Sequence, residues 1–398
     1  MSWNKKVLFI HHGGIAGGAP LSMLYTMQGL RDRGYQPIVG IVRPFQELHD
    51  LYNGHGFETH EMFYIPIFIT WSNSEGKRYN PIMWKGVFDA WKKWDNAKKM
   101  LFAFIKEHKV DMVHLNSVAL SNPASLLLEE EFPFVWHIRE HGPTKHKGNR
   151  YRFLQRRLNQ AKNVIFLSKA EQNSWLEGRN HGTIVHNFID FNKFDSTIDT
   201  CETRKRLNIS NNQKILLYVG GSKLHKGILP LLKAISILKK TWGENFICLM
   251  PDTFIEPTKA SKTQQKILSI IKTEGIEHQC KMMPFNPNIV ELFALCDILT
   301  FPATNPHFAR PVIEASAMKK PVIASNLKAI DELVIDGKTG YLIPADNPQV
   351  LAEKVQFLFD NEEECERMGE NGHNFARQEF EFNRQMEKIE KVYNACLK

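Results

Sequence analysis

The sequence lacks the features that mark membrane-spanning and exported proteins. It has no apolar run of the roughly 20 residues that a spanning helix requires. The most apolar stretch, Met62–Trp71, is too short and contains Pro66. The N-terminal residues lead directly into a strand-like run, Val7–Ile10, without the separate apolar core and cleavage site of a signal peptide. We therefore expect a cytoplasmic protein.

Cysteine is also scarce, and the spacing of the cysteines argues against disulfide-rich and zinc-binding classes of protein. The chain has 6 cysteines, none in a C-x-x-C pair or near a histidine at metal-ligand spacing. The pattern predicts neither a disulfide framework nor a zinc finger, and it is typical of the cell interior. The chain has no recognisable basic–aromatic RNA-binding motif, so we expect no nucleic-acid partner.

Positive charge is present, and the first half of the chain holds most of its excess. Residues 1–190 carry 24 Lys and Arg against 17 Asp and Glu, whereas residues 191–398 carry 27 against 26. Residues 77–109 hold nine basic and three acidic side chains, and residues 145–162 hold seven basic and none acidic. Such patches attract polyanions or an anionic membrane surface, so peripheral binding to the inner face of a membrane is one expectation.

A helical period over residues 84–105 places apolar side chains such as Trp84, Trp91 and Leu101 on one face. The same pattern fits an interfacial membrane helix or a helix that covers the N-terminal sheet. Both explanations remain open.

Continuous apolar runs alternate with helical periods along the whole chain. Runs of Val, Ile, Leu and Phe are typical of strands buried on both faces of a parallel sheet. The predicted strands are Val7–His11, Pro37–Ile41, Met112–Leu115, Phe134–His137, Asn163–Leu167, Ile215–Val219, Phe246–Met250, Ile298–Phe301, Pro321–Ala324 and Gly340–Ile343. Two such series predict an α/β protein with two Rossmann-like, doubly wound domains. We expect the domains at 1–190 and 191–375, followed by a helical segment, 376–398, that crosses back to the first domain.

Ligands of open parallel sheets bind at the carboxyl ends of the strands, so the loops there are candidate sites. In the first half, one loop runs from His12 to Pro20 and contains Gly17 and Gly18, which let the backbone approach a phosphate at the start of the next helix. A second loop, Trp136–Gly142, gathers the ionisable or charged groups of His137, Arg139 and Glu140.

Two more candidate loops lie in the second half. In Tyr218–Gly227, a lysine at a helix start can pair with a diphosphate while backbone amides bind its oxygens. After the strand that ends at Phe301, a proline-rich loop leads to a helix whose early glutamate can accept hydrogen bonds from a ribose diol. The candidate residues are Gly220, Gly221, Lys223, Lys226, His307, Phe308, Ala309, Arg310, Pro311 and Glu314.

Together these motifs resemble the retaining glycosyltransferases of family 4. The order is a glycine loop, HIRE (137–140), SKA (168–170), HNFID (186–190), GGSKLHKG (220–227) and FARPVIEASAMKKPVIAS (308–325). The resemblance covers nearly the whole chain and is strongest from 215 to 345.

The resemblance implies the GT-B architecture, in which two Rossmann-like domains face each other across a cleft. It implies a donor of the UDP- or GDP-sugar type bound by the second domain, and a glycan or lipid-linked acceptor bound by the first. Transfer of a hexose-type sugar would retain the anomeric configuration, without a metal ion or cofactor. Bacterial surface polysaccharide synthesis is the expected setting.

The same resemblance assigns roles to single residues. Lys226 would neutralise the diphosphate, Glu314 would hold the ribose, and the backbone of His307–Pro311 would cradle the sugar. His137 would lie near the reacting sugar, and Arg139 and Glu140 are acceptor-side candidates. Gly17 and Gly18 would approach the phosphate, and Phe285 would lie near the base.

Two positions depart from the family pattern. Pro306 stands where the family usually has a glutamate, and Gly221 where it usually has an arginine, so Lys223 or Arg310 is the candidate for the missing cation. Two alternatives to a transferase remain: a nucleotide-sugar-binding homologue with altered catalysis, and a sugar-nucleotide 2-epimerase of the same fold.

Overall fold

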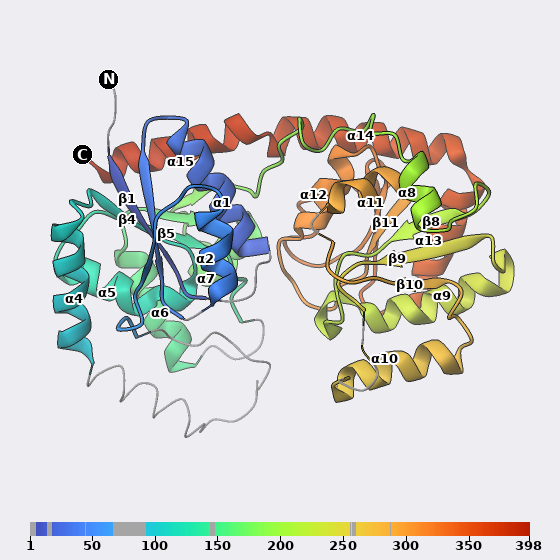
Figure 1. The fold of residues 1–398 in the computed structure, drawn as a ribbon, viewed down its shortest axis with the longest axis horizontal. Coiled ribbons are helices and arrows are strands. Elements are labelled where there is room, and N and C mark those ends of the chain that lie inside the picture. The colour runs from blue at the N-terminus through green and yellow to red at the C-terminus, as the bar shows by residue number, and fades with distance from the viewer. Residues whose placement is uncertain are drawn as a thin grey trace. The chain divides into compact units, whose positions relative to one another are not determined.

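The computed structural model describes residues 5–13, 18–43, 45–66, 93–143, 148–254, 256, 260–286 and 288–398. The chain divides into two compact units (Figure 1). The first comprises Met1–Asn187 and Asn383–Lys398, and the second comprises Phe188–Phe382.

The first unit is built on a seven-stranded, wholly parallel sheet with the order β3-β2-β1-β4-β5-β6-β7. Its strands are β1 (Lys6–His11), β2 (Gln36–Ile41), β3 (Thr59–Glu61), β4 (Met112–Leu115), β5 (Phe134–Ile138), β6 (Val164–Phe166) and β7 (Thr183–Ile184). The central strands are buried along their length, as strands covered on both faces must be.

Helices lie between these strands along the chain. They are α1 (Gly18–Arg31), α2 (Gln46–Asn53), α4 (Trp94–Glu107), η1 (Val118–Leu120), α5 (Ser121–Glu129), α6 (Asn149–Gln160) and α7 (Lys169–Leu176). The described part of the amphipathic segment is α4, and its buried residues, Ala97, Leu101 and Ile105, belong to the core of this unit. The period is therefore explained by core packing from Trp94 onward, while Trp84 and Trp91 lie outside the described residues.

The second unit contains a six-stranded parallel sheet with the order β10-β9-β8-β11-β12-β13. The strands are β8 (Lys214–Leu217), β9 (Phe246–Met250), β10 (Cys280–Met282), β11 (Ile298–Phe301), β12 (Val322–Ser325) and β13 (Gly340–Ile343). The helices are α8 (Cys201–Arg206), η2 (Leu224–Lys226), α9 (Ile228–Trp242), α10 (Lys262–Thr273), α11 (Ile289–Leu295), α12 (Arg310–Ala317), α13 (Pro348–Asp360) and α14 (Glu362–Phe380).

The C-terminal segment consists of two helices rather than one. Helix α14 ends at Phe380, Glu381 is extended, and α15 (Phe382–Cys396) follows. The units separate at 382/383 rather than at 375/376, because residue 375 lies inside α14, which packs in the second unit. Helix α15 lies in the first unit, where Tyr393 packs its ring edge-on against Tyr35 at 5.6 Å.

The fold class and all ten predicted strands are confirmed. The apolar runs did not reveal three short strands, β3, β7 and β10, which have three, two and three residues. Among the described residues, no helix combines the length and the apolar character needed to cross a bilayer.

Candidate functional site

In the second unit, the loop after β8 is shaped by three glycines. A Cβ on Gly220 would lie 2.2 Å from Tyr218 Oη, and Gly221 has a φ of +60°. Gly227 has a φ of +86°, and a Cβ there would lie 1.8 Å from the carbonyl oxygen of Pro302. Only glycine permits this approach, so the loop packs directly against the segment that follows β11.

Lys226 lies at the point where this loop enters α9. It ends η2, its Nζ lies 5.5 Å from the centre of the Phe301 ring, and among the described residues no carboxylate forms an ion pair with it. Burial, together with the charge of Lys223, lowers the pKa of Lys226 to about 7. A desolvated cation without a counter-charge is a favourable partner for an anion.

The N-terminus of α9 adds to this positive potential. The helix has 15 residues, no acidic residue in its first turn and no side-chain cap, and its N-cap is Gly227. The first N–H groups of such a helix have no partner within the helix, and the helix dipole adds positive potential there. Lys226 and this helix terminus together form a site suited to a phosphate.

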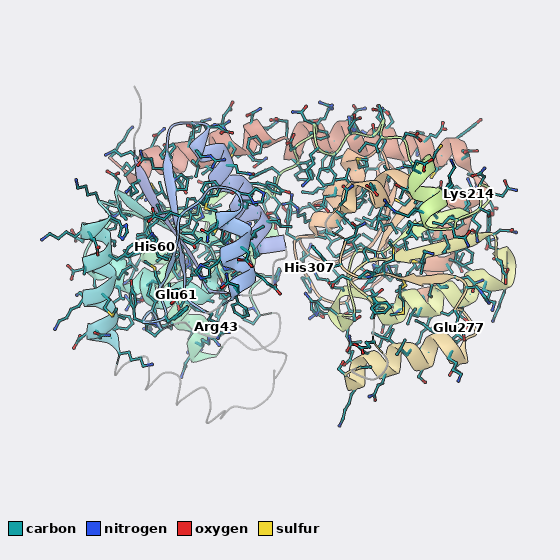
Figure 2. All side chains as sticks on the ribbon, viewed as in Figure 1. Arg43, His60, Glu61, Lys214, Glu277 and His307 are labelled. Atoms are coloured by element: carbon teal, nitrogen blue, oxygen red, sulfur yellow. The ribbon has the colours of Figure 1, made fainter. Side chains whose placement is uncertain are left out.

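The loop between β11 and α12 lies against the glycine loop. The Thr304 N–H donates to the carbonyl oxygen of His225 at 3.0 Å, so the structure brings the two predicted loops of this unit together. His307, labelled in Figure 2, places its Nδ1 2.9 Å from the Asn305 carbonyl oxygen. Phe308 and Ala309 are buried, which anchors the loop before α12 begins.

Arg310 and Glu314 form an ion pair within the first turns of α12. Arg310 Nε donates to Glu314 Oε1 at 2.7 Å, and both side chains are largely buried, with 12% and 10% of their surface exposed. In this arrangement the Arg310 guanidinium pairs with Glu314 and orients it. Lys226 is therefore the better candidate for the cation that binds the diphosphate. Pro311, in the first turn, supports the helix start without losing a needed hydrogen bond.

Two exposed aromatic side chains follow neighbouring strands at the same end of the sheet. Phe285 follows β10 and has 60% of its surface exposed, and Phe254 follows β9 with 63% exposed. Their loops are joined because the Phe254 N–H donates to the Met283 carbonyl oxygen at 2.9 Å. Phe285 is a candidate from the sequence and Phe254 is not, although the position of Phe254 just beyond a buried strand could have indicated it.

In the first unit, His137 and Arg139 lie at the end of β5. Arg139 Nε donates to the side-chain oxygen of Asn116, and its Nη1 donates to Asn187 Oδ1 at 3.1 Å. Its Nη2 lies 3.5 Å from His137 Nδ1. Burial, then the charges of Arg139 and His114, hold the pKa of His137 well below its ordinary value, so the imidazole is neutral near pH 7.

Glu140 has a local structural role. Its carboxylate accepts hydrogen bonds from the Ser117 hydroxyl, from the Val118 N–H at 3.0 Å and from the Arg139 N–H at 3.1 Å. It therefore stabilises the start of η1 and the turn that presents Arg139. Gly18 begins α1, and Gly17 lies outside the described residues.

Two further buried histidines in this unit were not identified from the sequence. His11 ends β1 and His114 lies in β4, and burial lowers the pKa of each to about 3. His114 Nδ1 lies 2.6 Å from the hydroxyl of Tyr393. The Nε2 atoms of His11, His114 and His137 are all buried and have no hydrogen-bond partner among the described residues. The sequence signal that could have identified His11 and His114 is a histidine at the end of, or within, an apolar strand.

Comparisons with known proteins find similar glycosyltransferases. Residues 199–375 match the family model described as glycosyl transferases group 1. The chain is 26% identical over 198 residues to D-inositol 3-phosphate glycosyltransferase of Corynebacterium diphtheriae, covering 49% of this chain and 45% of the relative. It is 25% identical over 223 residues to the capsular polysaccharide biosynthesis glycosyltransferase CapM of Staphylococcus aureus, covering 53% and 54%. The chain thus spans about half the length of these curated relatives.

Solved structures match the whole chain. A glycosyltransferase from Rickettsia africae superposes with a TM-score of 0.80 at 20% identity, covering 100% of this chain and 99% of the other. Anabaena HepE, solved in complex with UDP and glucose, superposes with a TM-score of 0.78 at 21% identity, covering 98% and 100%. These likenesses confirm the GT-B fold class.

Proposed function

We propose that this chain is a glycosyltransferase that moves a hexose-type sugar from a nucleoside-diphosphate donor to a glycan or lipid-linked acceptor, in the manner of family 4. The observation that carries the proposal is the position of Lys226. Its ammonium has no carboxylate partner among the described residues and lies beside the N-terminus of α9, in a loop that only glycines permit. The match of residues 199–375 to a glycosyltransferase family supports it.

The leaving diphosphate is the group on which catalysis acts. As the bond between the anomeric carbon and the phosphate oxygen breaks, negative charge develops on the diphosphate, and Lys226 and the amides of α9 stabilise it. The phosphate raises the pKa of Lys226 again, so the lysine is protonated when the charge develops. This cationic site would take the place of a divalent ion.

The remaining donor contacts follow from the same loops. Glu314 has one carboxylate oxygen oriented by Arg310, and its remaining lone pairs can accept the ribose hydroxyls. The backbone of His307–Pro311 would hold the sugar. Phe285 and Phe254, which follow adjacent strands, would offer exposed aromatic rings to the base.

The first unit would bind the acceptor. The acceptor oxygen forms the new bond to the anomeric carbon on the face that the diphosphate leaves, and its proton passes to a leaving phosphate oxygen. His137 is neutral, and its buried Nε2 can hydrogen-bond a sugar hydroxyl while Arg139 is held by Asn116 and Asn187. The net result is retention of configuration.

The setting we propose is bacterial surface polysaccharide synthesis at the inner face of the membrane. The likeness to CapM supports it, as does the surplus of basic residues in the first half. On α6, Arg152 and Arg156 are exposed on the side opposite the buried Leu154 and Leu158. Such a surface suits anionic lipid or a lipid diphosphate.

The test is donor binding followed by product analysis. Purified protein is screened by thermal unfolding against UDP- and GDP-hexoses with and without EDTA. A ligand at 100 times its Kd should add about 2.7 kcal/mol to stability. NMR of the product then reports the anomeric configuration. Absence of stabilisation by every nucleoside-diphosphate sugar contradicts the donor assignment, and an epimerised donor without transfer favours the 2-epimerase.

A further inference from the structure

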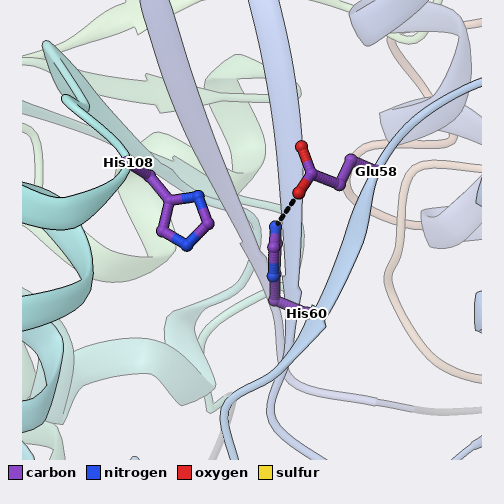
Figure 3. Close-up of side chains that lie close together, drawn as sticks. All are labelled: Glu58, His60 and His108. Atoms are coloured by element: carbon purple, nitrogen blue, oxygen red, sulfur yellow. Dashed lines mark ion pairs between the residues drawn. The ribbon is translucent and has the colours of Figure 1, made fainter.

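Three side chains that are separate in sequence meet at the edge of the first sheet. Glu58 and His60 lie two residues apart at the start of the edge strand β3, so they point to the same face. His108 is the C-cap of α4. Figure 3 shows the three side chains pointing toward one another, and one potential ligand atom from each lies within 4.8 Å of the other two.

The contacts between these side chains are those of potential metal ligands. His60 Nε2 lies 3.0 Å from Glu58 Oε1, yet this buried nitrogen has no aligned hydrogen bond to any residue that the structure describes. The rings of His60 and His108 have centroids 4.6 Å apart. Ligand atoms around a tetrahedral zinc ion are about 3.4 Å apart, since each lies about 2.0–2.1 Å from the metal. Small side-chain rotations therefore suffice to bring all three onto one ion.

The surroundings hold the two imidazoles in place. The ring of Phe104 stacks on His108 at 4.1 Å and meets the ring of His60 edge-on at 4.9 Å.

We propose that Glu58, His60 and His108 bind a divalent transition-metal ion of the zinc class, with water completing the coordination. Two imidazoles and one carboxylate suit zinc, whereas Mg²⁺ and Ca²⁺ prefer sets of oxygen ligands. The ion fastens the short edge strand β3 to the C-terminal end of α4. None of the three residues lies in the loops that carry His137, Arg139 or Lys226, so the site is structural and independent of the proposed transfer reaction.

The experiment is zinc binding to the full chain after dialysis against EDTA. Isothermal titration with Zn²⁺ should give one tight site, and thermal unfolding should shift upward by about 5 °C at 100 times the Kd. His60→Ala and His108→Ala should each weaken binding at least tenfold. Since the chain has 16 histidines, His55→Ala, which removes an exposed histidine of the same unit, serves as the matched control and should bind like the wild type.

Glu58→Gln provides a variant that preserves the fold, because the Glu58 side chain is 60% exposed. It should keep the metal-free unfolding temperature of the wild type and lose most of the zinc-induced shift. Excess Mg²⁺ or Ca²⁺ should not displace the zinc. Zinc affinity that stays unchanged in His60→Ala, His108→Ala and Glu58→Gln, or no binding by the wild type, overturns the proposal.

Discussion

The two units use the same doubly wound fold but present different chemistry at the ends of their strands. The second unit offers a cation, Lys226, and backbone amides. They lie in a loop whose glycines allow its backbone to pack closely against neighbouring atoms. The first unit offers the neutral imidazoles of His11, His114 and His137, all buried near Arg139. Under the proposed function, the cationic site of the second unit would bind the donor diphosphate, and the side chains of the first unit would bind the acceptor.

The largest expected effect on activity comes from removing the positive charge of Lys226 in the second unit. Lys226→Ala should lower kcat/KM by 10²–10³-fold, about 3–4 kcal/mol in transition-state stabilisation, because the leaving diphosphate loses its cation. Lys233→Ala, an exposed lysine on the same helix, should retain wild-type rates. Steady-state kinetics with the donor found by screening provides the measurement. A Lys226→Ala enzyme with full activity would contradict the diphosphate role.

Backbone geometry in the second unit gives the next largest effect. Gly227→Ala should cost roughly 3 kcal/mol in unfolding free energy, because its Cβ meets Pro302 and its φ is positive. Gly337→Ala, in the loop before β13, shares the positive φ (+69°) but has open space around its Cβ. It should cost only about 1 kcal/mol. Urea unfolding compares the two, and equal costs would show that the contact with Pro302 is unimportant.

Acid should act on the buried histidines of the first unit. Their folded pKa values, about 3 for His11 and His114, lie below the unfolded value of 6.5, so the unfolded state binds more protons between these limits. Their contribution to the free energy of unfolding is thus fully present above pH 6.5. It is lost as the pH drops toward 3, by at most about 1.4 kcal/mol per pH unit for each histidine. In His114→Gln the slope of unfolding free energy against pH should be shallower. An unchanged slope would mean that His114 does not contribute.

Lys226 should respond to pH in a different way. Because its pKa is about 7 without ligand and a bound diphosphate raises it, donor binding near pH 8 should take up as much as one proton. Calorimetry in two buffers of different ionisation enthalpy measures this uptake. Lys226→Ala should abolish it and His137→Gln should leave it in place, so uptake that persists without Lys226 would assign the proton to another group.

The smallest expected effect concerns the membrane. Replacing Arg152 and Arg156 by glutamate should weaken sedimentation with anionic vesicles by about 1 kcal/mol or more for each arginine. The wild type should bind at low salt and dissociate as salt rises. No binding of the wild type to anionic vesicles at low salt would contradict peripheral membrane association.

Much of the proposed donor site could be predicted because its determinants are local in sequence. The GGSKLHKG loop, the start of α9 and the Arg310–Glu314 spacing each lie within a few residues of a strand that an apolar run reveals. The role of Arg310 could not be predicted, because a side chain four residues from a carboxylate on a helix can pair with it or reach a ligand.

By itself the sequence determined two series of buried parallel strands and the loops where chemistry should be sought, because burial on both faces leaves continuous apolar runs. Only the tertiary structure decided which distant side chains meet. Tyr393 reaches His114 because α15 returns to the first unit, and Glu58, His60 and His108 converge because an edge strand lies beside the end of α4. Contacts between residues 48 or 279 positions apart leave no local pattern in the chain, since the fold alone brings them within reach.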